Sequence, residues 1–363
     1  MFIPRAIIAF ASLAYAQAAT AQVELPPPET SGEIEKDGTV VVGSFRLPPS
    51  VYLSEEAAAS LPREASDPQA MLSLILNAPD PAAIRPMAGR SMVPMHEMMR
   101  QTYGVTTEAG EIAGVPVMWA IPTGESAGSN SDKVMINFPG GGFVAGTADG
   151  TGMTESIPVA GLAGVRVVSI SYRQAPEHRF PAASEDSAAV YRALLESYAP
   201  ENIAIFGCSA GGALAAQSIA WYVQEGLPLP AAVGIFCASA DRFRGGDSMH
   251  YARPFQGLAQ QDGVAPISYF DGSERTNPLV SPVEDADLMA QFPPSLIITA
   301  TRAMEMSSAI NTHRELVKAG VEADLHVWDG LGHAFYYDPT LPESREAYQV
   351  MADFFAEHLG VVE

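Results

Sequence analysis

The chain has 363 residues, of which 47% are apolar and 17% are charged, and this is enough to bury a large core in one big α/β domain with appendages. Its formal net charge is −22, with 20 Lys and Arg against 42 Asp and Glu. This balance excludes nucleic-acid binding, which needs clusters of basic side chains, and it favours a neutral small molecule over an anionic one as the ligand. Two cysteines exclude a disulfide scaffold, and since neither Cys-x-x-Cys nor His-Glu-x-x-His occurs, no metal site is predicted.

The N-terminal segment is typical of a secretory signal peptide over residues 1–21. Arg5 precedes an apolar run, and Ala19-Thr20-Ala21 offers a small-x-small cleavage site. We therefore expect export to the periplasm or the medium. The run is too short to span a bilayer and no other stretch is long enough, so no stable membrane insertion is expected. Residues 22–50 start Pro-rich and polar and are predicted to form an N-terminal tail.

Residues 51–100 have a helical pattern and are predicted to form a helical cap. We expect this pattern to be broken at its prolines, which are Pro62, Pro68, Pro79, Pro81, Pro86 and Pro94. Six of the fifteen methionines lie between Met71 and Met99. Two interpretations stay open for them: ordinary core filling, or a deformable lid over an acyl pocket, because thioether side chains adapt to varied apolar shapes.

Residues 101–363 are predicted to form the core domain. A hairpin over 111–122, closed by a Ser- and Gly-rich loop at 123–132, precedes alternating strands and helices, which favours a doubly wound, mostly parallel sheet flanked by helices. The long irregular stretch 242–288 is expected to add a second cap element. Strands are expected near residues 134–138, 165–172, 203–206, 232–236, 295–299 and 324–328, and helices near 182–197, 211–225, 307–319 and 343–359.

A glycine-rich loop follows the first of these strands, as Pro139-Gly140-Gly141-Gly142-Phe143. Successive glycines free backbone N–H groups to point at a ligand, and acyl transfer needs such donors because negative charge develops on the carbonyl oxygen. A phosphate-binding loop is the alternative, but the next glycine comes one residue late for the dinucleotide fingerprint and no Gly-Lys-Ser/Thr follows. Gly141, Gly142 and Ala210 are therefore the candidate oxyanion-hole donors.

The segment Gly207-Cys208-Ser209-Ala210-Gly211 follows a short apolar run and precedes a small-residue helix pattern. A strand, a sharp turn and a helix are the context of a nucleophile elbow, where flanking glycines let the chain bend and expose the serine hydroxyl above a sheet. Ser209 is the candidate nucleophile. The pattern alone also fits an ordinary tight turn, so the prediction depends on the glycine loop and on a base.

The base is predicted to be His333, one of seven histidines. It ends the turn Gly330-Leu331-Gly332-His333, which follows a strand-like alternation at 324–328 and could hold an imidazole above the sheet edge. His326 lies inside that strand and is interpreted as structural. The other five histidines are interpreted as solvated or internally satisfied.

Cys208 and Cys237 are expected to lie close together, because consecutive parallel strands often neighbour each other. A disulfide between them is one outcome in an oxidising compartment. Two buried free thiols are the other, and the one we favour.

These segments together resemble the hormone-sensitive-lipase-like branch of the α/β-hydrolases, the bacterial family IV esterases. The matches run from about Val105 to the C-terminus, in the family's order and spacing, and include Gly140–Gly146, Ser171–His178, Phe180–Ala183, Glu185–Asp186, the elbow, Asn277–Pro282, Val327–Gly330 and His333–Phe335. The resemblance implies an α/β-hydrolase fold with a cap of N-terminal helices. It also implies a triad in the chain order serine, acid, histidine, which needs no cofactor.

Three positions depart from the family pattern. Pro139 replaces the histidine before the three glycines, so a fixed φ must orient the loop in place of that side chain's hydrogen bond. Cys208 replaces the aspartate usual before the nucleophile. The strand that ends in the catalytic aspartate corresponds to residues 295–302, and Ala303 follows it, so the third triad member is missing from its usual place.

Glu305 is the leading candidate for the missing acid, because its longer side chain could reach back to the imidazole and glutamate fills this role in some hydrolases. Asp241, at the end of the strand-like run 231–240, and Asp329, just before the His333 turn, are the alternatives. For each aspartate a cap or turn role competes. A dyad of Ser209 and His333 without an acid also stays open.

The expected function is hydrolysis of short- to medium-chain carboxylic esters. Ser209 attacks the acyl carbon, His333 takes its proton and delivers it to the leaving alcohol, and water then hydrolyses the acyl-enzyme. The expected partner is a small-molecule ester, and the sequence leaves a homodimer open. Two alternatives remain: a binding protein on a hydrolase scaffold that lost catalysis with its acid, and hydrolysis of an amide or lactone at the same site.

Overall fold

The computed structural model describes residues 32–43, 45–61, 77–124, 126–242, 245–255, 257 and 268–361. The chain divides into two compact units, residues 1–48 and 49–363. The signal peptide predicted at 1–21 and the start of the predicted tail lie outside the described residues. In the first unit, β1 (Glu33–Ile34) and β2 (Val40–Val41) form an antiparallel pair, so the predicted tail contains a short two-stranded ribbon.

An eight-stranded sheet forms the centre of the second unit, in the order β10-β9-β8-β7-β5-β6-β4-β3. Its strands are β3 (Val105–Ile112), β4 (Val115–Pro122), β5 (Val134–Phe138), β6 (Arg166–Ile170), β7 (Ile203–Cys208), β8 (Ala232–Phe236), β9 (Ser295–Ala300) and β10 (Ala323–Trp328). The pairings β3–β4 and β4–β6 are antiparallel, and the other five are parallel. The predicted α/β class and mostly parallel sheet are confirmed.

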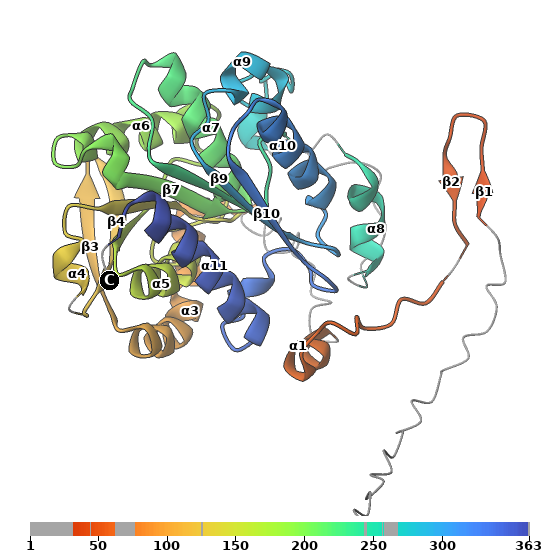
Figure 1. Cartoon of the computed structure of the whole chain (residues 1–363), viewed down its shortest axis with the longest axis horizontal. Coiled ribbons are helices and arrows are strands. Elements are labelled where there is room, and N and C mark those ends of the chain that lie inside the picture. The colour runs from red at the N-terminus through yellow and green to blue at the C-terminus, as the bar shows by residue number, and fades with distance from the viewer. Residues whose placement is uncertain are drawn as a thin grey trace, which may run out of the picture. The chain divides into compact units, whose positions relative to one another are not determined.

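Helices cover both faces of this sheet (Figure 1). One face carries α6 (Ala182–Leu195), α7 (Ala210–Gln224) and α10 (Met306–Lys318), and the other carries α3 (Pro81–Tyr103), α5 (Thr151–Ala163) and α11 (Pro342–His358). Successive strand residues point to opposite faces of the sheet, as expected for a period of two. Ile136 packs in one of two clusters of buried apolar residues and Met135 in the other. The shorter helices are α1 (Glu55–Ser60), α4 (Ser126–Ser129), α8 (Asp247–Phe255) and α9 (Ala286–Met289).

The six predicted strands and four predicted helices of the core are confirmed, but two elements differ. The hairpin begins at Val105 and not at residue 111, because most of β3 is exposed at the sheet edge and lacks an apolar alternation. Helix α5 is not among the predicted elements. Its residues 152–160 are all buried, so it has no polar face, and it contains Gly152, Gly161 and Pro158, which disfavour helix.

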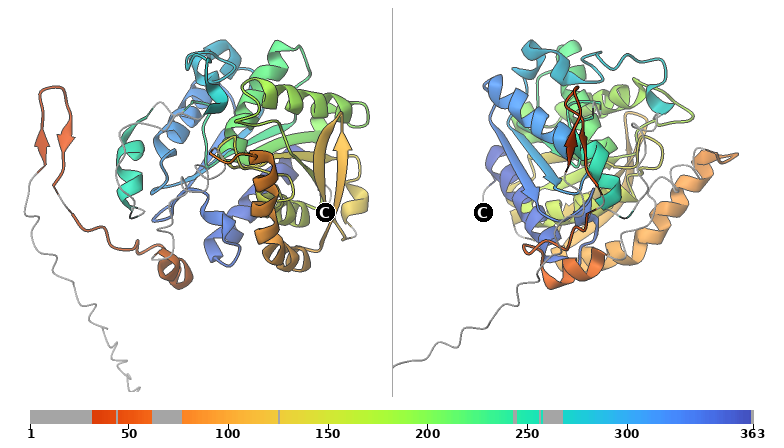
Figure 2. Two further views of the ribbon diagram at one scale, coloured as in Figure 1. Left: turned by 180° about the vertical axis from the view of Figure 1, so that it is seen from behind. Right: turned by 90° about the vertical axis from the view of Figure 1, so that its right-hand side faces the viewer.

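Helix α3 corrects the prediction that proline breaks the pattern over residues 51–100. Pro81 is its first residue, a position at which proline is tolerated, and Asp80 caps the helix by accepting from the Ala83 N–H at 3.2 Å. Pro86 and Pro94, however, lie inside an uninterrupted helix that packs against α5 (Figure 2). Both prolines are exposed, as are the residues four positions before them, so the carbonyls that lose a donor face water.

The cap boundaries stay predictions. Residues 62–76, with Pro62, Pro68 and Met71, lie outside the described residues, as do 243–244, 256 and 258–267 of the predicted second cap element. Among the described residues, no helix combines the length and apolar character needed to cross a membrane. The described His, Cys, Asp and Glu side chains also form no group of three or more that could hold a metal ion.

Candidate active site

The elbow predicted at residues 207–211 joins β7 to α7 and presents Ser209 half-buried at the carboxyl end of the sheet. Ser209 has φ 58° and ψ −122°, a strained conformation for a residue with a side chain. Its N–H donates to the Phe236 carbonyl at 2.8 Å, which holds the turn. A Cβ on Gly211 would overlap the carbonyl oxygen of Phe138, so glycine is required where the helix approaches β5.

Ser209, His333 and Glu305 lie in one hydrogen-bonded series. The Ser209 hydroxyl is 2.9 Å from His333 Nε2, and His333 Nδ1 is 2.9 Å from Glu305 Oε2. Glu305 is fully buried, whereas the His333 side chain is 24% exposed, so the imidazole stands between a buried carboxylate and an accessible hydroxyl. Such a series lets the imidazole accept a proton from the serine while the carboxylate stabilises the resulting cation.

The position of Glu305 follows from how two loops are joined. The loop after β9 is bonded to the loop after β10, because the Thr301 N–H donates to the Trp328 carbonyl at 3.0 Å and the Arg302 N–H to the Leu331 carbonyl at 2.9 Å. Glu305 then precedes α10, and its other oxygen, Oε1, lies 3.5 Å from the Thr299 hydroxyl. The Glu305 carboxylate thus reaches the imidazole from two residues beyond Ala303.

The two ring nitrogens of His333 are engaged by Glu305 and Ser209, and neither of these hydrogen bonds involves the alternative acids Asp241 and Asp329. Asp329 holds the turn instead: it accepts from the Thr301 hydroxyl at 3.0 Å and from the Ser50 hydroxyl at 2.5 Å. The carbonyl of buried Asp241 accepts from the Ser239 hydroxyl at 2.6 Å. The side-chain contacts of Asp329 match its competing interpretation as a turn residue.

The electrostatics of His333 favour its protonated form. Burial lowers the pKa of this imidazole, but the charge of Glu305 and its hydrogen bond raise it more, and the net pKa lies above the ordinary value of 6.5. An imidazole whose pKa is raised in this way binds a proton more strongly than a free imidazole. The same carboxylate fixes the tautomer that leaves Nε2 free to accept from Ser209.

The glycine loop follows β5 and lies beside the elbow. Gly141 has φ 145° and Gly142 φ 63°, which favour glycine. Within the described part of the chain, their N–H groups donate to no backbone carbonyl, so they are available to a ligand. Ala210 is buried at the start of α7, where helix N–H groups lack intrahelical acceptors.

Two side chains from outside the loop hold its first carbonyls. The Tyr172 hydroxyl donates to the Pro139 carbonyl at 2.7 Å, and the Thr151 hydroxyl donates to the Gly140 carbonyl at 2.7 Å. The fixed φ at Pro139 is thus supplemented by hydrogen bonds that the sequence does not reveal.

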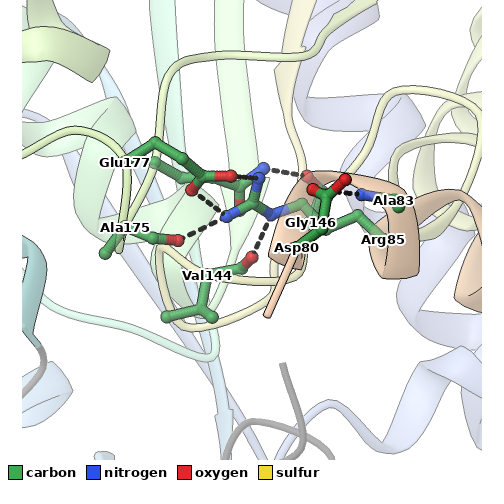
Figure 3. Close-up of polar contacts among 8 residues, drawn as sticks. Asp80, Ala83, Arg85, Val144, Gly146, Ala175 and Glu177 are labelled. Atoms are coloured by element: carbon green, nitrogen blue, oxygen red, sulfur yellow. Dashed lines mark hydrogen bonds and ion pairs between the residues drawn. The ribbon is translucent and has the colours of Figure 1, made fainter. Parts of the chain in front are cut away.

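Arg85 of α3 binds the segment that directly follows this loop (Figure 3). Its Nε donates to the Val144 carbonyl at 2.5 Å, and its Nη2 donates to the Ala175 carbonyl at 2.5 Å. The guanidinium also forms a bidentate pair with Glu177, at 2.8 and 2.6 Å, and this pair lowers the pKa of the Glu177 carboxyl. Arg85 is 8% exposed, so a helix of the predicted cap ties two core loops together through a buried cation.

We expect Arg85→Met to lower the free energy of unfolding by about 2 kcal/mol, because it removes a buried guanidinium and leaves the carbonyls of Val144 and Ala175 without their donors, whereas its ion-pair partner Glu177 is exposed. Urea denaturation measures this loss. The matched control is Arg192→Met, which breaks the exposed Arg192–Glu225 pair and should cost less than about 1 kcal/mol. Equal losses in the two variants would contradict the role assigned to Arg85.

The two cysteines are buried free thiols, not joined by a disulfide. Cys208 is hydrogen-bonded to Cys237, and burial followed by this contact raises the pKa of the Cys208 thiol well above its ordinary value. The favoured interpretation of two free thiols agrees with this arrangement. Among the other histidines, buried His96 is satisfied by the Thr154 hydroxyl at 3.0 Å, and burial lowers its pKa to about 4.

Besides Tyr172 and Thr151, sequence reasoning missed Arg85 and Glu155, which contact the segments that form the site. Arg85 lies far from every motif, and no local signal marks its partners. Glu155 is the lone acidic residue of the apolar, small-residue segment 153–163, and this isolation is the one signal that singles it out. It is fully buried and hydrogen-bonded to Asn137 at 2.9 Å.

The mostly parallel sheet, the strained serine turn and the serine–histidine–glutamate series define an α/β-hydrolase. The α/β hydrolase fold family matches residues 135–337, and the chain belongs to it. Among solved structures, an esterase from the bacterial hormone-sensitive lipase family is 30% identical with a TM-score of 0.66, covering 83% of this chain and 99% of its own. The predicted hormone-sensitive-lipase-like branch is thereby confirmed.

Other relatives agree with this placement. Another solved esterase is 30% identical with a TM-score of 0.76, over 88% of this chain and 98% of its own. An acetyl-hydrolase of Streptomyces hygroscopicus is 28% identical over 274 residues, which are 73% of this chain and 91% of that relative.

Proposed function

We propose that the protein is a serine carboxylesterase that hydrolyses neutral esters of short to medium acyl chains through an acyl-enzyme. The observation that carries the proposal is the series from Glu305 through His333 to Ser209, with both hydrogen bonds at 2.9 Å. Family membership and the curated relatives support ester hydrolysis as the reaction.

The proposed reaction begins with attack of the Ser209 hydroxyl on the acyl carbon. His333 Nε2 takes the hydroxyl proton, and Glu305 stabilises the imidazolium through Nδ1. The negative charge on the carbonyl oxygen is proposed to meet the N–H groups of Gly141, Gly142 and Ala210. The imidazolium then protonates the leaving alcohol, and a water activated by the same imidazole releases the acid.

The relatives support small substrates. One curated relative is an acetyl-hydrolase, and another is an ethyl acetate hydrolase of Pseudomonas putida, 29% identical over 243 residues. The methionines of α3 give no independent support to a lid over the acyl pocket. Met95 and Met99 pack in the core and Met92 contacts Thr154 of α5, which agrees with core filling for these three, whereas Met87 and Met98 are exposed.

The test is a series of p-nitrophenyl esters offered to the purified chain without added metal. We expect kcat/KM to peak at about C4 to C8 and to fall steeply by C16, because each methylene gains only ~0.8 kcal/mol while the pocket has room. Emulsified long-chain triglyceride is the control substrate. Equal turnover of long and short chains would contradict the proposed substrate range.

Two other functions remain to be separated by experiment. An amide or lactone hydrolase would use the same residues, and matched amide and lactone analogues of the best ester would be cleaved faster than the ester. A binding protein would bind the ester without turnover. The intact hydrogen-bonded series, with Glu305 in the acid's role, favours the catalytic alternative.

A further inference from the structure

A carboxyl group outside the proposed triad is buried beneath the site. Glu155 lies in the middle of α5, is fully buried, and accepts three hydrogen bonds. Asn137 Nδ2 donates to its Oε2 at 2.9 Å, the Tyr337 hydroxyl donates to its Oε1 at 2.5 Å, and the Cys208 backbone N–H donates to the carboxyl group. Burying a carboxyl costs free energy, so a group retained in such a place calls for an explanation.

Each hydrogen bond leads to a different segment of the candidate site. Cys208 directly precedes the elbow serine, and Asn137 lies near the end of β5, which runs into the glycine loop. Tyr337 lies in the short helical turn that follows His333. Glu155 is therefore the point at which the elbow, the glycine loop and the histidine turn are joined by side-chain contacts.

The Tyr337 hydroxyl that Glu155 binds also lies next to Gly140 of the glycine loop. A Cβ placed on Gly140 would lie 2.8 Å from this hydroxyl and 2.8 Å from the Cys208 carbonyl oxygen. The elbow and Tyr337 thus leave no room for a side chain at Gly140, the first glycine of the loop.

The environment of Glu155 favours its neutral form. Burial raises the pKa of this carboxyl to about 8, although its three hydrogen bonds oppose the shift. The titratable groups that face it are a thiol and four phenols, and burial raises the pKa of each: Cys208, Tyr172, Tyr336, Tyr337 and Tyr348. Glu155 is therefore the first of this group to ionise as pH rises.

We propose that Glu155 is a positioning residue, whose buried carboxyl fixes the positions of the elbow, the glycine loop and the histidine turn relative to one another. The inference rests on the proposed function, because it takes Ser209 and His333 as the reacting pair. A second consequence follows from the chemistry of the group. Ionisation of Glu155 places a negative charge beneath the site where an oxyanion must form, so activity is opposed as the carboxyl loses its proton.

Two substitutions separate the hydrogen bonds from the charge. Glu155→Leu removes both, and we expect kcat on a butyrate ester at pH 7 to fall on the order of 10²-fold with little change in KM, because loop placement and not ester binding is lost. Glu155→Gln keeps a carbonyl and a donor but cannot ionise, so it should retain kcat within about threefold at pH 7. The ratio of its kcat to that of wild type should rise by about tenfold from pH 7 to 9.

Thr154→Val is the matched control, since Thr154 is equally buried in α5 but bonds His96 of α3, away from the site. It should leave kcat unchanged, and urea unfolding of every variant shows that the compared proteins are folded. Wild-type kcat in Glu155→Leu, or equal losses in the Leu and Gln variants with a constant ratio across pH, would overturn the inference. Phosphonylation of Ser209 in wild type, measured in parallel, distinguishes this from failure of the proposed function, in which Ser209 would not be labelled.

Discussion

Glu305→Gln is expected to lower kcat on a short-chain ester by on the order of 10⁴-fold while the fold stays intact. The amide neither holds the tautomer that leaves His333 Nε2 free for Ser209 nor stabilises the imidazolium. Steady-state kinetics on p-nitrophenyl butyrate, with urea unfolding alongside, measure the two quantities. Glu305 is buried directly before α10, and glutamine has about the size of glutamate. The substituted side chain should therefore occupy the same place.

Asp241→Asn and Asp329→Asn are the controls, and each should cost far less in kcat. The acid limb of the pH profile gives a second readout. Because Glu305 holds the pKa of His333 above 6.5, activity of the wild type should fall below a midpoint above 6.5, and this midpoint should move to lower pH in Glu305→Gln. A large loss in Asp241→Asn with normal Glu305→Gln turnover would assign the acid to the segment that follows β8. No loss in any of the three would mean a dyad.

Ser209→Ala is expected to lower kcat by about 10⁶-fold, because without the hydroxyl no acyl-enzyme can form. Ser187→Ala is the control: Ser187 is a fully buried serine whose hydroxyl bonds Ser218 and Tyr222 at 2.7 Å inside the core. The control should keep wild-type kcat. Residual turnover in Ser209→Ala near that of the control would show that another residue attacks the ester.

The parts of the site that the sequence predicts are those whose chemistry is local. The elbow needs glycines next to its serine because β5 approaches within contact of Gly211, and this leaves a five-residue signature. The glycine loop and the His333 turn carry similar signatures. Glu305 could be predicted because it follows a buried strand by only a few residues, so that chain length limits where its carboxylate can lie.

The parts that the sequence does not predict depend on contacts between distant segments. Glu155 and Tyr337 are separated by 182 positions, and Arg85 and Glu177 by 92, so no local pattern links either pair. Helix α5 escaped prediction for a related reason. Burial on all sides removes the polar–apolar periodicity that marks a surface helix, and tertiary packing overrides the poor helix propensity of its glycines and of Pro158.

In helix α3, too, tertiary packing overrides local propensity, and here the prediction that fails is a break in the helix. Pro86 and Pro94 predict a broken segment on propensity alone, yet the helix continues through both. Its buried residues, among them Met99 and Arg85, are held by the core and by the core loops, and the prolines occupy the exposed side. Local rules therefore located the core strands well and the proline-containing helix poorly.

The central claim is that Ser209 becomes acylated during turnover. An alkyl p-nitrophenyl phosphonate tests it most directly, because attack by the nucleophile leaves a stable adduct on its oxygen. Peptide mass spectrometry of the inactivated protein should find one adduct per chain, on the peptide that contains Ser209, in step with the loss of esterase activity. Full activity in the presence of a Ser209 adduct, or inactivation with the adduct on a different residue, would contradict the account.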